Sequence, residues 1–336
     1  MTPSIPVINF RPADNSSSNG VESVARDVRH ACREFGFFYV VGHGISQTLQ
    51  KRLEQLSQEF FSWSHDEKMK IAMAHGGRAW RGYFPVGEEL TSGQPDQKEG
   101  LYFGAELGED HPRVRAMTPL HGANLFPPID GFRECVLEWL NALTELGQRL
   151  MRLIAVSLNL PEDYFRRDCT RDPLILFRIF HYPPLQKSVG SDWSVGEHTD
   201  YGLLTILKQD QTGGLQIKSK DNWIAAPVVE NSFVCNLGDM LDRMTGGTYR
   251  STPHRVRNVS SQGRLSFPFF FDPGWDTVPQ KLPTTTTAQD DADQRWDGAS
   301  VHDCSGTYGD YVLQKVGRVF PDLQSETQQD SAMDSQ

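Results

Sequence analysis

The first hundred residues alternate between short apolar runs and segments whose apolar residues recur at helical spacing. The runs "IPVINF" and "GFFYVVGHG" are rich in aromatic and β-branched residues and predict buried strands. Two further sets of apolar residues fall on one side of a helix: Val21, Val24, Ala25, Val28, Ala31 and Phe35, and then Ile45, Leu49, Leu53, Leu56 and Phe60. The pattern predicts the order strand, helix, strand, helix.

Two segments in the middle of the chain differ sharply in pattern. Residues 76–104 are polar and rich in Gly and Pro, which predicts a long loop without regular elements, of the kind that often covers a site. From Ile129 to Leu158, apolar residues follow the helical period. We expect this segment to be the longest helix and to support the region that follows it.

After Pro173 the chain consists of short apolar runs separated by turn residues. These runs are "LILFRIFHY", "GLLTILKQ", "GLQIKS", "WIAAPVV", "SFVCNL", "HRVRN" and "RLSFPFFF". Several short strands at this spacing indicate a β-sandwich or a jelly-roll barrel. With the helices of the first half, this predicts an α+β fold.

Composition and charge narrow the function. The 336 residues carry a formal net charge of −10 without a block of Lys and Arg, which disfavours nucleic acid as a partner. No apolar stretch approaches the roughly 18 residues that cross a bilayer, and the start does not resemble a secretion signal. Five widely spaced cysteines without a C-x-x-C pair indicate a reducing compartment. We expect a cytoplasmic protein that acts on a small molecule and binds no membrane; its oligomeric state is left open.

Three residues form a candidate metal site. His198 and Asp200 lie two apart in "GEHTDYGLLTIL", at the start of a predicted strand, so both side chains leave the same face. His254, on another predicted strand in "STPHRV", can be brought opposite them by a barrel. Two histidines and one carboxylate on one face of an octahedral ion are the ligand set of non-haem iron(II) oxygenases. Iron(II) with one carboxylate keeps a charge of +1, which attracts a chelating 2-oxo acid.

A second pair of residues suits the other end of such an acid. Arg264 and Ser266 lie in "GRLSFPFFF", ten residues after His254, and their i, i+2 spacing places both on one strand face. A guanidinium binds a carboxylate through two hydrogen bonds, and a hydroxyl adds another. The order H-x-D, distal His, R-x-S therefore predicts a site for iron(II) and 2-oxoglutarate.

These motifs resemble the 2-oxoglutarate and iron(II)-dependent oxygenases, in the branch that contains isopenicillin N synthase. The likeness also includes "CREFGFFYVVGHGI", "FHYPP", "GGLQI" and "NLGDMLDRMTGG". It implies a double-stranded β-helix, or jelly-roll, with a helical amino-terminal part, with residues 4–110 as the amino-terminal region and residues 172–275 as the β-core. By composition, residues 320–336 are expected to form a disordered tail.

The resemblance also implies functional roles. His198, Asp200 and His254 would bind Fe(II), and Arg264 and Ser266 would bind 2-oxoglutarate, joined by Tyr182 of "HYPP". Decarboxylation of 2-oxoglutarate with O2, supported by ascorbate, would be coupled to oxidation of a small organic molecule, most commonly to hydroxylation. Phe180 departs from the family pattern, because plant members have asparagine at this position.

Substrate contacts and rival functions complete the hypotheses. Arg178 shares its strand face with Tyr182, because their positions differ by an even number, and Arg81 and Tyr83 lie in the predicted covering loop. We consider these three residues as substrate contacts. Alternatives are an isopenicillin N synthase-like oxidase that does not use 2-oxoglutarate, a zinc hydrolase, and a non-catalytic β-barrel module.

Overall fold

The computed structural model of the protein describes residues 4–14, 18–91, 93–184, 193–219, 222–257, 263–285, 292–295, 298, 300–302 and 305–320. Except for Phe320, the tail predicted for 320–336 lies outside these residues. The helices are α1 (Arg11–Asp14), α2 (Ser18–Glu34), α3 (Gln47–Phe61), α4 (His65–Met69), η1 (Met73–Ala79), α5 (Pro112–Arg115), α6 (Phe132–Ser157), α7 (Tyr164–Asp168), α8 (Asp239–Thr245), η2 (Ala292–Gln294) and α9 (Tyr308–Val319). The strands are β1 (Val7–Asn9), β2 (Phe37–Val41), β3 (Gly82–Phe84), β4 (Glu99–Gly104), β5 (Leu174–Tyr182), β6 (Val195–His198), β7 (Leu204–Gln209), β8 (Leu215–Ser219), β9 (Asn222–Ala225), β10 (Phe233–Leu237), β11 (His254–Val256) and β12 (Arg264–Asp272).

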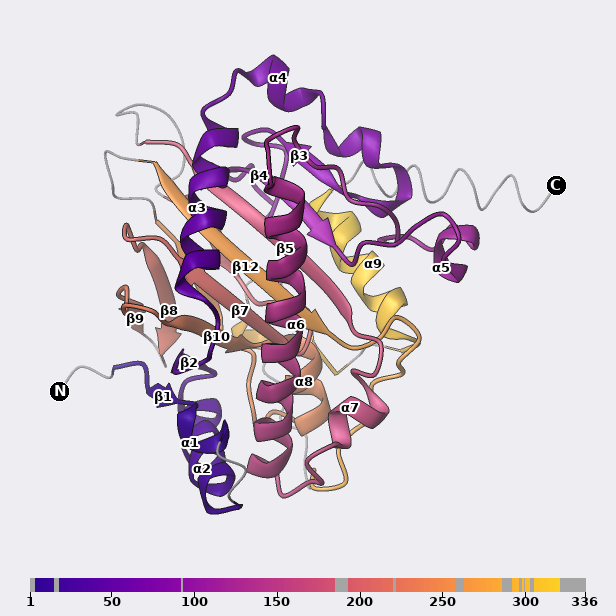
Figure 1. The fold of residues 1–336 in the computed structure, drawn as a ribbon. Coiled ribbons are helices and arrows are strands. Elements are labelled where there is room, and N and C mark those ends of the chain that lie inside the picture. Colours follow the sequence, from indigo (N-terminus) through magenta and orange to yellow (C-terminus); the bar gives the residue numbers. More distant parts are fainter. Residues whose placement is uncertain are drawn as a thin grey trace.

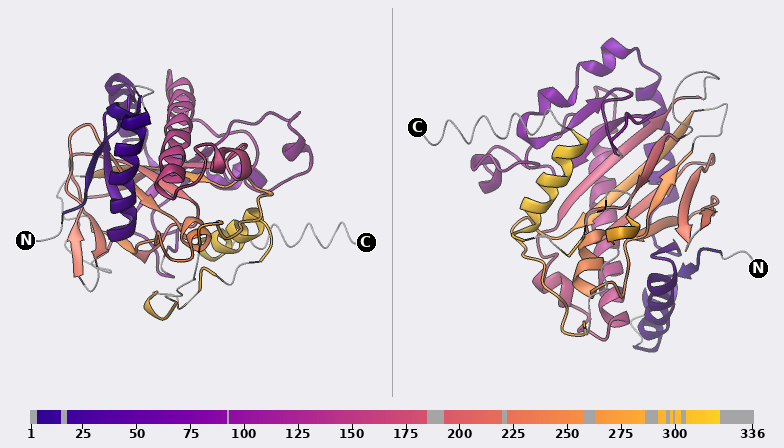
Figure 2. Two further views of the ribbon diagram at one scale, coloured as in Figure 1. Left: turned by 90° about the horizontal axis from the view of Figure 1, so that it is seen from below. Right: turned by 180° about the vertical axis from the view of Figure 1, so that it is seen from behind.

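Two β-sheets form the centre of the molecule (Figures 1 and 2). The larger sheet has the strand order β1-β2-β10-β7-β12-β5-β4-β3, and the smaller has the order β6-β11-β8-β9. Strands that are neighbours in space are often distant in sequence, as β2 and β10 are, and from β5 onward the chain passes repeatedly between the two sheets. This is the jelly-roll architecture predicted from the strand pattern, and every predicted run after Pro173 contains a strand.

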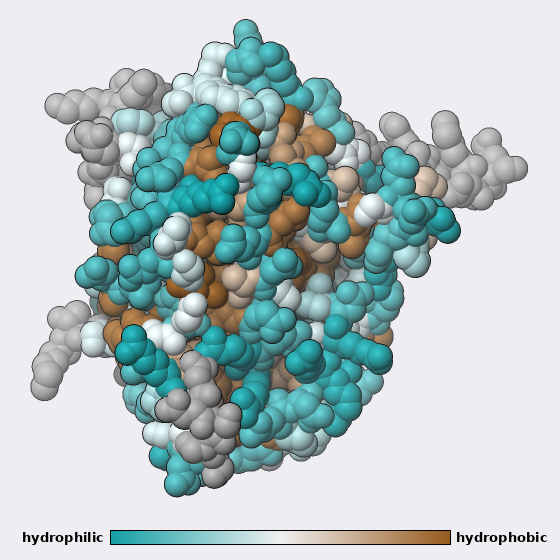
Figure 3. All heavy atoms as spheres, viewed as in Figure 1, coloured by the Kyte–Doolittle hydropathy of each residue, from teal (hydrophilic) through white to brown (hydrophobic). Residues whose placement is uncertain are grey.

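Helices α3 and α6 lie across one face of the larger sheet (Figure 1). The predicted long helix is confirmed as α6, and its indole Trp139 is buried, with its ring centroid 6.1 Å from that of Phe177 and 5.9 Å from that of Phe233. At Gly147 a Cβ atom would lie 2.5 Å from the Phe271 ring, so this glycine lets the helix approach β12 closely. Polar residues dominate the outer surface on this side, with hydrophobic residues visible between them (Figure 3).

The amino-terminal order of elements is confirmed, but one prediction was wrong. Residues 76–104 contain β3 and β4, which extend the larger sheet beyond β5, instead of a loop without regular elements. All six residues of β4 are buried, although it begins with Glu99. That carboxylate accepts hydrogen bonds from Lys68 (2.7 Å) and Tyr83 (2.6 Å) and lies 2.7 Å from His181. Because partners from three other elements satisfy this charge, a strand that is polar in sequence can be buried.

Helix α9 was not predicted from the sequence. It lies on the other side of the larger sheet from α6, where Figure 2 shows it in yellow. Thr307 and Asp310 form a capping box at its first turn, so two backbone N–H groups at the helix start are satisfied locally. Within the described part of the chain, no helix is both long and apolar enough to span a bilayer.

Candidate active site

A cavity between the two sheets contains most of the residues singled out from the sequence. It encloses about 1020 Å³ of empty space, part of it open to solvent. Strands of both sheets and helix α9 contribute to its wall, and the lining includes His198, Asp200, His254, Arg264, Ser266, Tyr182 and Arg178. Most of the predicted site residues therefore face one space, although they come from separate segments of the chain.

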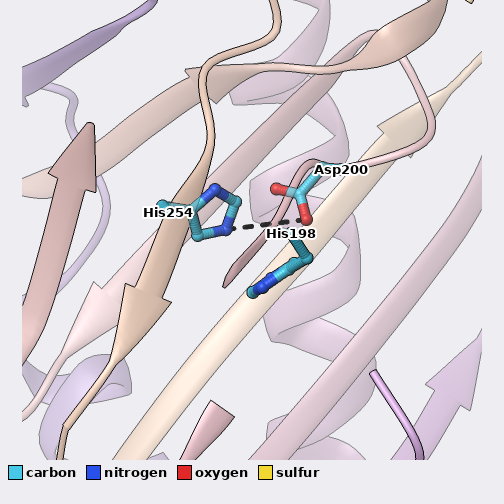
Figure 4. Close-up of side chains that lie close together, drawn as sticks. All are labelled: His198, Asp200 and His254. Carbon is cyan, nitrogen blue, oxygen red and sulfur yellow. Dashed lines mark ion pairs between the residues drawn. The ribbon is translucent and has the colours of Figure 1, made fainter. Parts of the chain in front are cut away.

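His198, Asp200 and His254 point toward one another (Figure 4). One ligand-type atom from each residue lies within 4.8 Å of the other two, and His254 Nε2 is 3.8 Å from Asp200 Oδ1. His198 is directly opposite His254 in the pairing of β6 with β11, so the sheet register itself brings the two imidazoles together. Among the described residues, this is the one group of three His, Cys, Asp or Glu side chains spaced to hold a metal ion.

Backbone carbonyls orient both imidazole rings. Nδ1 of His198 lies 2.9 Å from the carbonyl oxygen of Gly196, and Nδ1 of His254 lies 3.3 Å from that of Thr252. A proton on Nδ1 leaves Nε2 with its lone pair directed at the space between the three side chains. Burial, and then the neighbouring His254, lower the pKa of His198 to about 3, so its ring is neutral at physiological pH. A neutral imidazole is the form that binds a metal.

The carboxylate of Asp200 is held on one side only. Its Oδ2 accepts hydrogen bonds from Thr205 Oγ1 (2.5 Å) and Asn236 Nδ2 (2.6 Å), which leaves Oδ1 facing the histidines. Burial favours the neutral acid, but the two histidines and these hydrogen bonds outweigh burial and lower the pKa of Asp200. The side chain is thus charged and fixed in direction, as a metal ligand requires.

The sequence interpretation placed His198 and Asp200 on one strand, and this was wrong. His198 is the last residue of β6, and Asp200 lies in the turn that leads to β7. The two side chains still converge, and Asp239 N holds the segment after β6 in place by donating a hydrogen bond of 2.8 Å to the carbonyl oxygen of Asp200. The irregular segment between β6 and β7, and not strand alternation, brings the carboxylate to the histidines.

Arg264 also lines this cavity. This arginine is fully buried, and its Nε donates a hydrogen bond of 2.5 Å to the carbonyl oxygen of Gly213. Both Nη1 and Nη2 lack a hydrogen-bond partner among the described residues. A buried guanidinium with unused donors is energetically costly unless an anion occupies the space in front of it. The arginine is therefore arranged to bind a carboxylate.

Ser266 and Tyr182 lie beside this arginine. Ser266 follows it on β12 and faces the same cavity, as the i, i+2 spacing predicted. Tyr182 is directly opposite Arg264 in the pairing of β12 with β5, and its ring centroid lies 4.5 Å from the guanidinium carbon. Burial raises the pKa of Tyr182 above its ordinary value, although Arg264 and Lys98 oppose that effect, so its hydroxyl remains a hydrogen-bond donor.

A buried cluster of charges also lines the cavity. Arg178 Nη1 lies 3.1 Å from Glu89 Oε1, and Lys98 Nζ lies 2.8 Å from Glu89 Oε2. Burial opposes the charge on Glu89, but Lys98 and Arg178 lower the pKa of its carboxyl group. Tyr102 also donates a hydrogen bond of 2.7 Å to this glutamate, whereas Nε of Arg178 has no partner in the described part of the chain. Sequence reasoning found Arg178 and missed Glu89 and Lys98.

Arg81 and Tyr83, the other two predicted substrate contacts, do not line this cavity. Successive residues of a strand point to opposite faces. On β3, Phe84 faces the cavity side, with its ring centroid 6.1 Å from that of Phe180, so Tyr83 faces away. The Tyr83 ring instead lies 5.8 Å from that of Phe60, and its hydroxyl donates to Glu99. Arg81 lines a separate cavity.

The sequence matches two family models. Residues 5–129 match the amino-terminal domain of the non-haem dioxygenases named for morphine synthesis, and residues 174–273 match the 2OG-Fe(II) oxygenase superfamily. A probable iron/ascorbate oxidoreductase of Dictyostelium discoideum is 49% identical, with 96% of each chain covered. A 1-aminocyclopropane-1-carboxylate oxidase of Dictyostelium mucoroides is 39% identical over 95% of each chain.

A solved structure gives the same result at the level of the fold. A full-length Neurospora crassa protein in complex with alpha-KG (2-oxoglutarate) and thymine is similar with a TM-score of 0.77 and 26% identity, covering 93% of this chain and 96% of that one. The chain belongs to the 2OG-Fe(II) oxygenase superfamily. It is an oxidoreductase that depends on iron(II) and 2-oxoglutarate, and its core is the double-stranded β-helix expected from the resemblance.

Two further parts of this oxygenase's cavity were not anticipated. Helix α9 supplies an apolar wall of Val312, Val316 and Val319, which continues into Phe320. Leu90 N donates a hydrogen bond of 3.2 Å to the carbonyl oxygen of Val319, so the segment that carries Glu89 is joined to this wall. The apolar wall of α9 and the buried charges around Glu89 are therefore neighbours in the lining of the cavity.

Proposed function

We propose that the protein hydroxylates a small organic molecule at the site built from His198, Asp200 and His254, with 2-oxoglutarate bound by Arg264. The observation that carries the proposal is the occurrence, in one cavity, of a convergent His-Asp-His group and a buried arginine with two unused donor nitrogens. Neither feature would be stable as a purely structural arrangement without compensation for its buried charge.

The three convergent side chains fit iron(II). Two neutral imidazoles and one carboxylate are the donor set of non-haem iron oxygenases, and they leave positions on the ion for other ligands. Asn236 and Thr205 hold the far oxygen of Asp200, so they would orient this ligand and tune its basicity. When bound, iron(II) supplies the activation of O2, using the two electrons released as 2-oxoglutarate decarboxylates to succinate, and one oxygen atom enters the substrate.

Arg264 fits the distal carboxylate of 2-oxoglutarate. Its two free nitrogens can each donate to one carboxylate oxygen, and Ser266 and Tyr182 line the same part of the wall. A zinc hydrolase gains nothing from such a group, and no observation favours that alternative. The alternative is an oxidase that turns over its substrate without 2-oxoglutarate. The experiment below distinguishes the two by measuring whether turnover requires 2-oxoglutarate.

For the substrate, we propose a small molecule with a carboxylate that reaches Arg178. This arginine lines the cavity, and its Nη1 is paired with Glu89. Its buried Nε has no hydrogen-bond partner among the described residues. The valines of α9, which line the same cavity, suit an apolar portion of the same molecule. One relative is named for the oxidation of 1-aminocyclopropane-1-carboxylate, a small amino acid, which agrees with a substrate of this class.

The test is a turnover screen of the full chain with iron(II), ascorbate and 2-oxoglutarate. Amino acids and other small carboxylic acids are compared with their amides, and succinate release and product mass are measured. We expect succinate to form in step with a product that has gained one oxygen atom, and we expect R178Q to raise KM for the acid more than R178K does. Turnover without 2-oxoglutarate, a product that has lost two hydrogens, or equal use of acid and amide would each contradict the corresponding part of the proposal.

A further inference from the structure

A second cavity lies outside the active site, where the loop before and after α5 meets the start of β5. It contains about 400 Å³ of empty space, part of it open to solvent, and it shares no lining residue with the larger cavity. Its polar lining residues are Arg81, His111, Arg113, His121 and Asp172, and Trp275 forms part of the apolar wall.

Arg81 is the unusual residue of this cavity. Only 1% of it is exposed, and its Nη2 donates a hydrogen bond of 2.7 Å to the carbonyl oxygen of Leu120. Within the described part of the chain, Nε and Nη1 have no partner. Burial lowers the pKa of Arg81 to about 10, which still leaves the guanidinium charged at physiological pH. A charge in this position is expected to have a counterion.

The described part of the chain does not provide that counterion. Glu106 is the carboxylate that raises the pKa of Arg81 against the effect of burial, yet no carboxylate oxygen lies within ion-pair distance of the guanidinium among the described residues. The oxygens of Glu106 are used elsewhere: Oε2 accepts from Asn124 N and Nδ2 at 2.9 and 2.7 Å, and Oε1 accepts from Arg133 Nη2 at 3.4 Å. The attraction is therefore distant and indirect.

The backbone around Arg81 is shaped to hold this side chain. A Cβ atom at Gly104 would lie 2.0 Å from Nη2 of the arginine, and a Cβ atom at Gly76 would lie 2.4 Å from its carbonyl oxygen. The glycine at position 104 provides space for the buried guanidinium, and the glycine at position 76 provides space for the backbone of the same arginine. This arginine is closely enclosed and keeps unused donor groups, which suits it to bind a ligand.

The rest of the lining adds positive charge and hydrogen-bonding capacity. Arg113 lies in the first turn of α5 and is 22% exposed, and its Nη2 is paired with the exposed Asp276 at 2.8 Å. His121 packs edge-on against Trp275, with ring centroids 5.1 Å apart. Burial, together with the charges of Arg113 and Arg81, lowers the pKa of His121. Asp172, the acidic lining residue, is exposed.

We propose that this second cavity binds a small oxyanion, either a carboxylate or a phosphate group, with Arg81 as its buried ligand and Arg113 as its outer ligand. Both groups match the flat guanidinium, which donates to two oxygens at once, and either would neutralise the buried charge. A water molecule could accept a hydrogen bond but could not supply the negative charge. The proposal does not depend on the reaction proposed for the larger cavity.

Thermal unfolding of the full chain tests this. The active-site variant R264Q serves as the background, so that anions cannot act through Arg264, and inorganic phosphate or acetate replaces chloride at constant ionic strength. A ligand that binds only the folded state stabilises it by RT ln(1 + [L]/Kd) and so raises Tm. We expect phosphate or acetate to raise Tm, and the relative size of the two effects identifies the preferred oxyanion.

The same titration in variants locates the site. R264Q/R113Q should bind the effective anion at least tenfold more weakly, and R264Q/R81M should not respond. If R264Q/R81M fails to fold, the comparison with R264Q/R113Q still tests the proposal, because Arg113 is partly exposed and its replacement should leave the fold intact. R264Q/R115Q is the matched control, since Arg115 lies on the same helix but is 68% exposed and does not line the cavity. No rise in Tm with either anion, or equal responses in the R113Q and R115Q variants, would overturn the proposal.

Discussion

Two arginines in this protein share an uncommon state but lie in different surroundings. Arg264 and Arg81 are both buried, and each has two nitrogens without a hydrogen-bond partner among the described residues. Arg264 faces the same cavity as the His-Asp-His group, whereas the cavity of Arg81 contains two histidines and a second arginine but no such metal-type cluster in the described part of the chain. A buried arginine with free donors thus indicates a binding site for an anion. Only the neighbouring residues indicate whether that anion takes part in a reaction.

The largest effect that separates the two cavities is expected from the metal ligands. H198A removes one of the two neutral imidazoles, and we expect iron-dependent decarboxylation of 2-oxoglutarate to fall by roughly 1,000-fold or more, since the remaining two ligands hold the ion poorly. Iron content and succinate release are the measurements.

The exposed His65 provides the control, because H65A removes a histidine from the surface of α4. H65A should keep iron and activity. The oxyanion response of the second cavity should also survive in H198A. Full activity of H198A would remove the assignment of this residue as a ligand, and a lost oxyanion response would mean that the two cavities are not independent.

A smaller effect is expected at Arg264. R264Q cannot neutralise the distal carboxylate and loses charge-assisted hydrogen bonds that contribute about 1.5–3 kcal/mol each, so KM for 2-oxoglutarate should rise roughly 100-fold. R264K keeps the charge but not the two-pronged geometry, and its KM should lie between those of R264Q and the unaltered protein. Initial rates at varied 2-oxoglutarate test this, and an unchanged KM in R264Q would place the co-substrate elsewhere.

The difference between the two arginines also shows what the sequence can reveal. Arg264 was predicted because it stands in a motif of fixed order after His254, and because strand alternation places Ser266 on its face. Arg178 was placed by the same alternation with Tyr182. Arg81 was assigned to the substrate because it lies in a polar segment expected to cover the site. That segment instead contains two strands at the edge of the larger sheet, and their pleat turns alternate residues away from the cavity.

Other parts of the site depend on contacts that no local pattern encodes. Asn236 supports Asp200 from within β10, and its only signal is one amide among apolar residues in "SFVCNL". Glu89 and Lys98 neutralise each other across an irregular stretch of sequence. Helix α9 became part of the cavity through tertiary packing of its valines, although its capping residues could have predicted where it begins. Regular periodicity predicted the jelly-roll, whereas tertiary contacts, both polar and apolar, determined the rest of the site.

A separate effect, on stability, concerns a carboxyl group that lines the larger cavity and not the second one. Asp272, at the end of β12, accepts a hydrogen bond of 2.7 Å from Tyr308, but burial raises its pKa to about 7. Below about pH 4 the acid is protonated in both the folded and the unfolded chain, so it does not make stability depend on pH. Between about pH 4 and 7 only the unfolded chain releases the proton. This group therefore lowers the free energy of unfolding as pH rises, and its penalty is constant above about pH 7.

D272N removes that penalty, because asparagine accepts the Tyr308 hydroxyl without carrying a charge. In the iron-free protein, D272N should gain stability relative to the unaltered chain as pH rises from about 4 to about 7, by up to about 4 kcal/mol at about 1.36 kcal/mol for each unit of pKa. Chemical denaturation across this pH range measures the gain. D110N is the control, since Asp110 is 99% exposed and pairs with Arg115 at the surface, so its stability difference should hardly change with pH. A gain that is independent of pH would show that Asp272 is not the titrating group, and that the larger cavity tolerates its carboxylate in the charged form.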